Sequence, residues 1–376
     1  MKIITYEYSE IKPADWSINK IKLGQINLVV GDTASGKTRF LNTIFNLGRM
    51  VTGTSPLLGS CKWDIVFEHL GVNYQWKIQT ARRSDNRVVI AEENLSQSKG
   101  GSFQSLLKRT KSSFSFQSKP LKAKLPTDTL SAAILKEEPS VMPIIEAFSL
   151  ILRRNFFSDA LNVVMPVTIT QPKFFDKAPK SPNEISNMNL FLNPKLALLH
   201  RYFPIVYKQI CDNFSSIFTF VSSIGIKDIQ EIRKGFNPPG PTPVLCIKER
   251  NVRQWLSIDQ LSTGMQKVML ILTDVYTMPD GSIYLIDEYE NSLGVSAIDF
   301  FPPFLIELER DIQFIITSHH PYLINNIPVQ NWLVFHRDGS QVQIRYGTEN
   351  VEAYGESKQT RFLKLINDPF YSGNID

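Results

Sequence analysis

The stretch 31–38, with the sequence GDTASGKT, constrains this chain more than any other feature, because it fits the pattern G-x-x-x-x-G-K-[ST]. The apolar run 26–30 before it predicts a buried parallel strand, and residues 38–50 after it have apolar side chains at helical spacing. Gly31 and Gly36 allow the backbone to curl so that amide groups point at phosphate oxygens. Lys37 would reach the β- and γ-phosphates, and the Thr38 hydroxyl would ligate magnesium. The sequence therefore predicts a site for ATP and Mg²⁺.

The predicted ATP-binding residues come from this loop and from the start of the helix that follows. They are Gly31, Thr33, Ala34, Ser35, Gly36, Lys37, Thr38 and Arg39. A chance match in a turn is the alternative, and the strand and helix on either side of the loop argue against it.

A second acidic element follows the apolar run 282–286, where the chain continues into Asp287 and Glu288. Asp287 would lie at the carboxyl end of a parallel strand, where such sheets place their ligands, and would belong to the magnesium shell. Glu288 would point to the opposite side and could orient or deprotonate the attacking water. A strand followed by a merely acidic turn is the alternative.

The stretch 261–267, LSTGMQK, opens an apolar helix expected at 265–272. Ser262 could be only an N-cap. The same geometry, a helix N-terminus with a hydroxyl and a bare glycine backbone, is also an anion site.

A fourth element is the apolar run 314–316, which ends in Thr317-Ser318-His319-His320. Its distance from the acidic strand, with a helix expected between 297 and 309, predicts a right-handed βαβ crossover. That connection would place His319 beside Asp287 and near the phosphates, although a lone histidine at a strand end is more often structural.

The chain changes character twice. Strands are expected at 2–8 and 26–30, and an antiparallel meander at 61–68, 74–80 and 87–92, followed by a flexible serine-rich loop at 96–118. Helical patterns follow at 141–153 and at 194–220, the latter broken at Pro204, before strands return from 244 onward. The expected domains are residues 1–128 and 241–376, which form one α/β lobe, and a helical insertion at 129–240.

Composition indicates a soluble globular chain. Of the 376 residues, 43% are hydrophobic and 20% are charged, which suits a buried core. No apolar run reaches the roughly 18 residues of a membrane helix, and the first residues lack a signal-peptide pattern. The three cysteines, Cys61, Cys211 and Cys246, have no metal-ligand spacing. We therefore expect a cytoplasmic protein that makes no membrane contact.

Basic residues gather in the segment 77–124, which holds eleven Lys or Arg and three acidic residues. A mobile basic segment of this kind could hold the phosphate backbone of DNA. A charge run that only faces water is an equal alternative.

The order of these elements resembles the ABC-type ATPases: Walker A, a Leu-Ser-x-Gly-x-Gln signature, Walker B with an adjacent glutamate, and a switch histidine. Within them it resembles the RecF, SMC and OLD-like branch, and 290–293 is similar to the Glu-x-x-Leu stretch of bacterial antiphage defence ATPases. The resemblance covers 1–50 and 244–337. It implies an α/β fold: an ABC-type P-loop nucleotide-binding domain, a mixed sheet with an antiparallel subdomain, and a helical insertion.

The family implies a role for each matched residue. Lys37, Glu288 and His319 would be catalytic, and Thr38 with Asp287 would hold Mg²⁺. The signature would cap the ATP of a second copy, and its residues are Leu261, Ser262, Gly264 and Gln266. The family therefore implies an ATP-linked homodimer or higher homo-oligomer.

Some family positions stay open in this sequence. The Q-loop glutamine could be Gln79, Gln97, Gln104, Gln117 or Gln171. Tyr6 or Tyr8 could stack on adenine or simply pack in the core. The tail 338–376 lacks the acidic cluster of a Toprim nuclease, so we expect this chain not to cut nucleic acid itself.

Two functions are consistent with these features. The first is the ATPase subunit of a bacterial antiphage system, which acts as a nucleotide-dependent switch or scaffold for a separate effector, expected to be a nuclease. The second is a RecF-like DNA-binding ATPase of DNA repair, to which the basic segment 77–124 would contribute. A scaffold with a vestigial nucleotide site is a third reading, which the full set of chemical residues disfavours.

Overall fold

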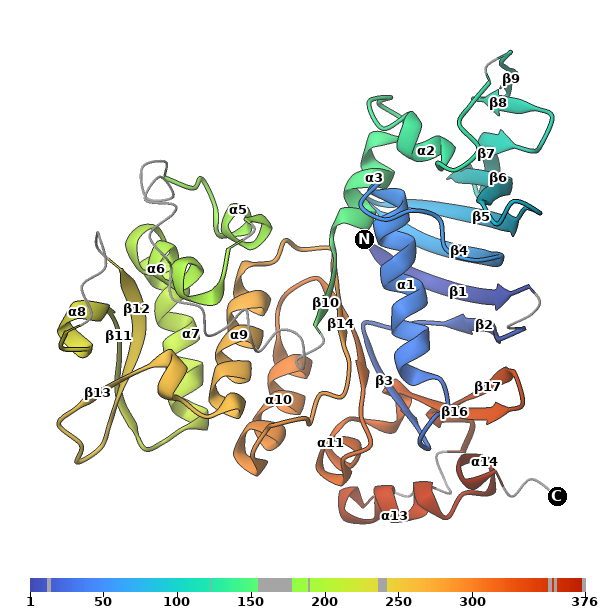
Figure 1. The fold of residues 1–376 in the computed structure, drawn as a ribbon. Coiled ribbons are helices and arrows are strands. Elements are labelled where there is room, and N and C mark those ends of the chain that lie inside the picture. The colour runs from blue at the N-terminus through green and yellow to red at the C-terminus, as the bar shows by residue number, and fades with distance from the viewer. Residues whose placement is uncertain are drawn as a thin grey trace. The chain divides into compact units, whose positions relative to one another are not determined.

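The computed structural model describes residues 1–11, 15–122, 124–154, 178–188, 190–235, 242–350, 354 and 357–373. The chain forms two compact units (Figure 1). The first contains residues 1–154, 280–289 and 308–376, and the second contains residues 155–279 and 290–307. Within the described residues, no helix is long and apolar enough to cross a membrane.

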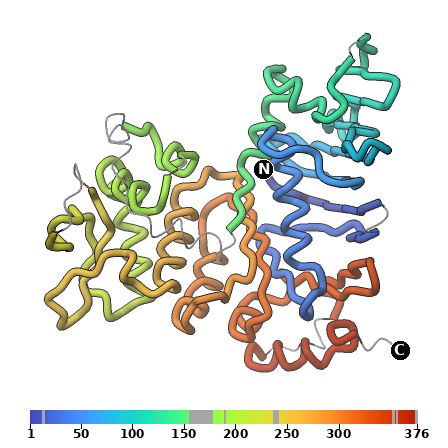
Figure 2. Tube along the Cα trace, in the orientation of Figure 1, coloured from blue at the N-terminus to red at the C-terminus, as the bar shows by residue number. Residues whose placement is uncertain are grey.

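The first unit is built on a mixed sheet, which among the described residues has 14 strands in the order β10-β14-β15-β3-β16-β17-β2-β1-β4-β5-β6-β7-β8-β9. Five neighbouring strands at one end are all parallel: β10 (Ile151–Arg154), β14 (Ser282–Ile286), β15 (Ile312–Thr317), β3 (Ile26–Gly31) and β16 (Trp332–Asp338). Their carboxyl ends therefore meet at one edge of the sheet. Figure 2 shows how β3, early in the chain, lies among strands from its last third.

The rest of this sheet is mainly antiparallel. Its strands are β17 (Gln341–Tyr346), β2 (Ser17–Lys22), β1 (Lys2–Glu10), β4 (Cys61–His69), β5 (Val72–Arg82), β6 (Val88–Lys99), β7 (Ser102–Arg109), β8 (Phe114–Phe116) and β9 (Lys119–Pro120). Burial alternates along them, as in β4 and β5, so one face packs on the core and the other is polar. The predicted meander and the mixed α/β class are confirmed.

The prediction of a flexible loop at 96–118 is wrong. Residues 96–99 continue β6, and β7 and β8 pair in antiparallel register behind it. Leu95 and Leu107 are fully buried and lie opposite each other, while the serines and glutamines between them are exposed or half-buried. A strand with one polar face has the composition of a loop, which is why the pattern misled.

Two helices cover the buried face of this sheet. They are α1 (Lys37–Val51) and α3 (Met142–Ser149), and the short α2 (Ser131–Ile134) precedes α3. Phe148 of α3 packs edge-on against Phe67 and Trp76, and Phe40 of α1 contacts Tyr6 and Phe335. The aromatic side chains thus join the loop helix to both halves of the sheet.

The helix expected at 141–153 is too long at its carboxyl end. It stops at Ser149, and Ile151–Arg154 form the edge strand β10 beside β14. That pairing ties residues 129–154 to the first unit, whereas we expected them in a helical insertion. Residues 242–279, expected in the α/β lobe, lie in the second unit, and the expected boundary near 240 falls outside the described residues.

The second unit is largely helical. Its elements are α5 (Pro182–Asn187), α6 (Leu192–Tyr202), α7 (Pro204–Ile217), β11 (Val221–Asp228), α8 (Ile229–Ile232), β12 (Pro243–Glu249), β13 (Trp255–Ser257), η2 (Ile258–Gln260), α9 (Thr263–Thr277) and α10 (Val295–Glu307). The predicted break at Pro204 is confirmed, since this proline begins α7. Pro302 and Pro303 both lie inside α10. Strands β11, β12 and β13 form a separate antiparallel sheet.

After β15, the first unit also contains several short helices. They are α11 (Pro321–Asn326), η3 (Val329–Asn331), η4 (Gly347–Asn350), η5 (Lys358–Thr360), α13 (Arg361–Ile366) and α14 (Pro369–Ser372). Asp368 caps α14 and accepts hydrogen bonds from the Arg345 guanidinium and from the Tyr354 hydroxyl. Burial alone would raise the pKa of the Asp368 carboxyl, but the hydrogen bonds from these two side chains outweigh it and lower that pKa. This anchor holds the tail on β16 and β17.

Candidate functional site

The candidate site lies at the carboxyl edge of the five parallel strands, in the first unit. The loop 31–38 follows β3, Asp287 and Glu288 follow β14, and Ser318 and His319 follow β15. Since β15 lies between β14 and β3, all three segments end at the same edge. This is the place where open parallel sheets bind their ligands.

The loop between β3 and α1 has the backbone of a phosphate cradle. Ala34 and Gly36 have positive φ angles of 63° and 99°. A Cβ at Gly36 would lie 3.0 Å from the Trp16 ring, and a Cβ at Gly31 would lie 2.5 Å from the Phe335 carbonyl oxygen. Both glycines are therefore required by conformation or by close packing.

The start of α1 suits an anion. Its first-turn amides have no acceptor within the helix, and no side chain caps it. Acidic side chains usually occupy this position, but here the first turn carries Lys37 and Arg39. Arg39 is offset by Glu10, with which it pairs at 2.6 Å. The positive charge of Lys37 at the positive end of the helix dipole would be stabilised by an anionic ligand.

Lys37 lies over the loop itself. Its ammonium donates to the carbonyl oxygens of Gly31 and Asp32 at 2.8 and 2.9 Å. Ser35 is buried, and its hydroxyl lies 3.5 Å from the same ammonium. The amine is thus positioned over the backbone cradle, where triphosphate oxygens would compete for its protons.

Asp287 is the centre of the site. Its carboxylate accepts hydrogen bonds from the Thr38 hydroxyl at 3.0 Å and from the Thr317 hydroxyl at 2.8 Å, both on Oδ1. The Arg153 guanidinium pairs with Oδ2 at 3.2 Å. Asp287 is only 7% exposed. One buried carboxylate therefore links the loop helix, β14, β15 and β10.

These residues fit the magnesium and nucleotide that the loop implies. The Thr38 hydroxyl and the Asp287 carboxylate are hard oxygen donors in direct contact, and such donors are the ones Mg²⁺ prefers. The loop supplies amides and an ammonium for the phosphates. Bound there, Mg²⁺ would neutralise charge on the β- and γ-phosphates.

The Glu288 side chain differs from that of Asp287 in its exposure to solvent. Glu288 has a positive φ of 46°, which is unusual for a glutamate, and its amide donates to the Thr317 hydroxyl at 2.8 Å. The side chain is exposed, while that of Asp287 is buried. Backbone strain of this kind gathers at functional sites, because the surrounding structure must hold it. The turn after β14 thus presents one carboxylate inward and one outward.

His319 is exposed and follows the buried Ser318 at the end of β15. The direct contact with Asp287 comes from Thr317, two residues earlier. The next histidine, His320, caps α11 through Nδ1, which accepts from the Tyr322 amide at 3.3 Å. The structure thus gives His320 a structural role.

Two contributors to the site were not predicted. Thr317 belongs to the Thr-Ser-His stretch, and its position at a strand end was a usable signal. No local signal indicates Arg153, because the sequence around it predicts a helix and its partner Asp287 is 134 residues away. Its side chain is 14% exposed, and its Nε has no hydrogen-bond partner among the described residues.

The signature residues lie in the second unit. Ser262 is exposed and caps α9 by accepting from the Met265 amide at 3.3 Å. Gly264 is buried against the turn after Glu290, where a Cβ would lie 2.3 Å from the Ser292 carbonyl oxygen. Leu261 is 7% exposed. Of the predicted trans-acting set, Ser262 is the side chain that faces solvent.

Gln266 does not match its predicted role. It is 5% exposed, and its amide donates to the carbonyl oxygens of Ile258 and Leu261 at 2.8 and 3.1 Å. Those bonds hold the segment before α9. A buried amide with two internal acceptors stabilises the segment before its own helix.

The open family positions are partly resolved. Tyr6 is buried and donates to Thr43, and Tyr8 is buried and donates to Cys61 and Glu10, so neither can stack on adenine. Burial raises the pKa of both phenols. The glutamines at 79, 97, 104 and 117 lie in or next to the antiparallel strands, away from the parallel edge, and Gln171 lies outside the described residues.

Arg39, one of the predicted ATP-binding residues, is held by an acidic and an aromatic side chain. Its guanidinium pairs with Glu10 at 2.6 Å and stacks on Trp16, with 4.6 Å from Cζ to the ring centroid. The side chain is 40% exposed. One face of the guanidinium lies on Trp16 and its N–H edge pairs with Glu10, so its other face could stack on a nucleotide base.

Arg39→Ala should therefore weaken ATP binding about tenfold and leave binding of inorganic tripolyphosphate within about twofold. Isothermal titration with both ligands checks this. Arg49→Ala, at the other end of α1, is the matched control and should change neither affinity. An equal loss for both ligands would assign Arg39 to the phosphates instead of the base.

Comparison with known proteins agrees with this geometry. Residues 150–325, a little under half of the chain, match the family described as "AAA domain, putative AbiEii toxin, Type IV TA system". This stretch includes α9, β14 and β15 but not the loop 31–38. No curated protein matches the chain.

Solved structures of SMC head domains are similar in fold. The SMC head bound to the C-winged helix domain of ScpA has a TM-score of 0.54 at 11% identity, over 92% of this chain and 98% of that chain. The Pyrococcus furiosus SMC head with an extended coiled coil, bound to the C-terminal domain of ScpA, gives 0.48 at 11% identity, over 93% and 98%. The first likeness, with the sheet order, identifies a P-loop nucleotide-binding fold. The family match and the fold both agree with a nucleotide site at the parallel edge of the sheet.

Proposed function

We propose that this chain hydrolyses ATP between two copies of itself and that its nucleotide state switches a separate effector, a nuclease, in bacterial antiphage defence. The observation that carries the ATPase part is the Asp287 carboxylate, which contacts both Thr38 and Thr317 at the parallel edge. A loop, a metal-side carboxylate and a strained, exposed Glu288 in one place form a hydrolytic site.

Each residue has a distinct task in this proposal. The loop amides and Lys37 hold the β- and γ-phosphates, and Thr38 with Asp287 orients the metal. Glu288 accepts a proton from the attacking water, since it is an exposed carboxylate that directly follows the metal-side Asp287. His319 contacts the γ-phosphate and reports its presence.

The second copy supplies the last group. Ser262 stands exposed at the N-terminus of α9, a helix of 15 residues, and such a terminus attracts phosphate. We infer that Ser262 of one copy closes the ATP site of the other. ATP then favours the paired state because it contacts both copies there, which is how a ligand shifts a conformational equilibrium.

Ser262→Arg should leave ATP binding by the single subunit intact and weaken ATP-driven pairing at least about tenfold. Sedimentation velocity with and without ATP checks this. The matched control is Ser222→Arg, because Ser222 is an exposed serine of β11. It should leave ATP-driven pairing unchanged. An unchanged sedimentation profile for Ser262→Arg would remove the trans-capping idea.

The defence role is supported by the description of the matched family, which names a toxin of a toxin–antitoxin system. The RecF-like alternative loses its mobile basic segment, because residues 77–124 largely form strands. Copurification from the native host, followed by identification of the partner and a nuclease assay, tests the effector part.

A further inference from the structure

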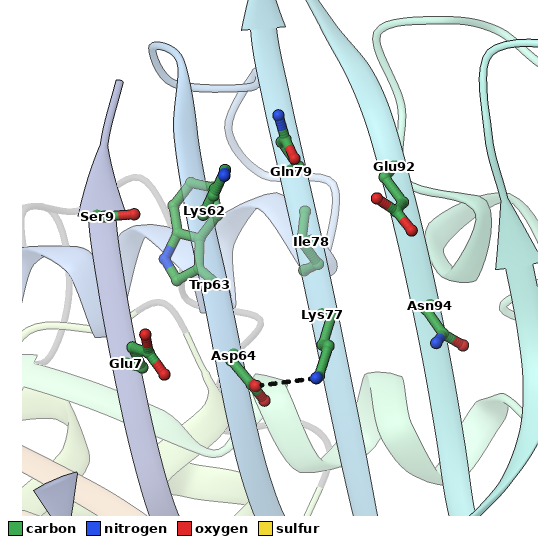
Figure 3. A pocket seen from close by; sticks show the side chains of 10 residues that line it. All are labelled: Glu7, Ser9, Lys62, Trp63, Asp64, Lys77, Ile78, Gln79, Glu92 and Asn94. Carbon is green, nitrogen blue, oxygen red and sulfur yellow. Dashed lines mark ion pairs between the residues drawn. The ribbon is translucent and has the colours of Figure 1, made fainter. Parts of the chain in front are cut away.

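The antiparallel strands carry two hollows that differ in charge. The first is a shallow groove of about 240 Å³ on the polar face of β1, β4, β5 and β6. Figure 3 shows its acidic and basic side chains side by side, with Lys77 paired to Asp64 at 3.4 Å. The lining holds two cations, Lys62 and Lys77, and three carboxylates, Glu7, Asp64 and Glu92. This shallow groove is therefore slightly acidic and does not attract an anionic partner.

The second hollow, which we call the basic cavity, lies at the far end of the same strands and measures about 940 Å³. Its rim carries five exposed cations, and its lining includes no acidic side chain. The rim cations are Arg82, Arg83, Lys111, Lys122 and Lys124. The floor is apolar and is formed by Val89, Ile90, Phe114 and Leu125.

Among the residues that the structure describes, none of the five rim cations forms an ion pair. Asp85, on the adjoining turn, pairs with Arg87 at 2.8 Å and attracts Arg83 only at longer range. Five like charges around one opening repel one another, so an anionic ligand would be stabilised there.

The cavity has a built wall. Arg109 is 6% exposed and donates to the carbonyl oxygens of Thr129 and Pro126 at 3.0 and 2.6 Å. Glu93, fully buried, accepts from the Ser131 amide at 2.7 Å. Burial raises the pKa of the Glu93 carboxyl. These bonds, with the one from the Ile90 amide to the Thr127 carbonyl oxygen at 2.8 Å, hold the segment 126–131 against β6 and β7.

The floor decides which anion fits. A nucleic acid backbone would satisfy the rim but would leave the aliphatic floor without a partner, and bases stack on exposed aromatic faces. The aromatic side chain of this floor, Phe114, is 6% exposed. An acidic peptide with a large apolar side chain would satisfy both the rim and the floor.

We propose that the basic cavity binds an acidic segment of a partner protein, with one large apolar side chain of that segment on the partly exposed Val89 and Leu125. The carboxylates that flank this side chain would pair with Arg82, Lys122 and Lys124. Arginine is suited to two-pronged pairing with a carboxylate, and the lysines act as point charges. This interaction is separate from the nucleotide site and does not depend on ATP hydrolysis.

The experiment uses the whole chain and three fluorescein-labelled probes at low salt: the peptides DDEDLFDDED and DDEDGSDDED, and a poly-dT oligonucleotide. Fluorescence anisotropy should show the tightest binding for the Leu-Phe peptide, with affinity falling as salt is raised. The double variant Lys122→Glu with Lys124→Glu should weaken that binding at least about tenfold. Lys62→Glu, in the shallow groove, is the matched control, and its affinity for the Leu-Phe peptide should stay within about twofold of that of the natural protein.

Three results would overturn the proposal. Equal binding of the two peptides would show that the floor takes no part. Tighter binding of the oligonucleotide would assign the cavity to nucleic acid. Absence of peptide binding, or undiminished binding in the double variant, would show that the cavity is not the site. Circular dichroism confirms that each variant is folded, and its ATP turnover, which the cavity does not affect, separates this test from that of the nucleotide site.

Discussion

Glu288→Gln should reduce ATP turnover at least about 100-fold and leave ATP binding unchanged, because the amide keeps the size of the side chain but cannot accept a proton. Glu288 is exposed at the parallel edge, and its backbone is held at a φ of 46° by the bond from its amide to Thr317. The substitution leaves the backbone amide that donates to Thr317 in place, so the turn should keep its conformation. The variant should also accumulate as the ATP-bound pair, since the state that hydrolysis normally dissolves would persist.

Steady-state phosphate release, binding of a fluorescent ATP analogue and sedimentation velocity measure these three properties. Asp287→Asn is the informative neighbour. It should weaken magnesium-dependent ATP binding itself, because its carboxylate orients the metal. Full turnover in Glu288→Gln would show that another group is the base.

Arg153→Met should lower the free energy of unfolding by about 3 kcal/mol, the loss that follows when a buried ion pair keeps only one partner. The Asp287 carboxylate would keep the hydroxyls of Thr38 and Thr317 but would lose its cation. Magnesium with ATP should then stabilise the variant more than the natural protein, because the metal supplies the missing positive charge. Thermal unfolding with and without Mg²⁺–ATP measures both effects.

The control for Arg153 is Arg49→Met. Both guanidinium groups lie over the Phe45 ring, each with 6.0 Å from Cζ to the ring centroid, and Arg49 is exposed on α1. Arg49→Met should cost less than half as much stability and show no larger gain from Mg²⁺–ATP. Equal losses in the two variants would mean that Arg153 acts through its contact with Phe45 and not through Asp287.

The sequence was most informative where chemistry is local. The loop 31–38, the acidic end of β14 and the strand before His319 each combine an apolar run with polar residues directly after it, and the structure brings them to one edge. That meeting follows from the rule that parallel strands share their carboxyl side. The fold class was therefore accessible, whereas the catalytic roles remain predictions until turnover is measured.

The rest depended on contacts that no local pattern reveals. Arg153 reaches its partner only because β10 pairs with β14, and its own sequence favours a helix. Gln266 fits a signature by position but is turned inward to its own backbone. The strands β7 and β8 contain serine and glutamine at exposed or half-buried positions, and this composition is typical of a loop. In each case burial, which composition does not show, decided the outcome.

The placement of β3 between β15 and β16 has a consequence for how this protein is made. Thr38 and Asp287 are 249 residues apart in the chain, so at roughly 5–20 residues per second the loop leaves the ribosome on the order of 10 to 50 s before its metal-side carboxylate. Until then the central strand has no neighbour on either side, because both are synthesised later. A growing chain cannot complete the site, and nascent β3 is an exposed apolar strand in need of protection. Stalled or truncated products should therefore aggregate and should not act as partial ATPases.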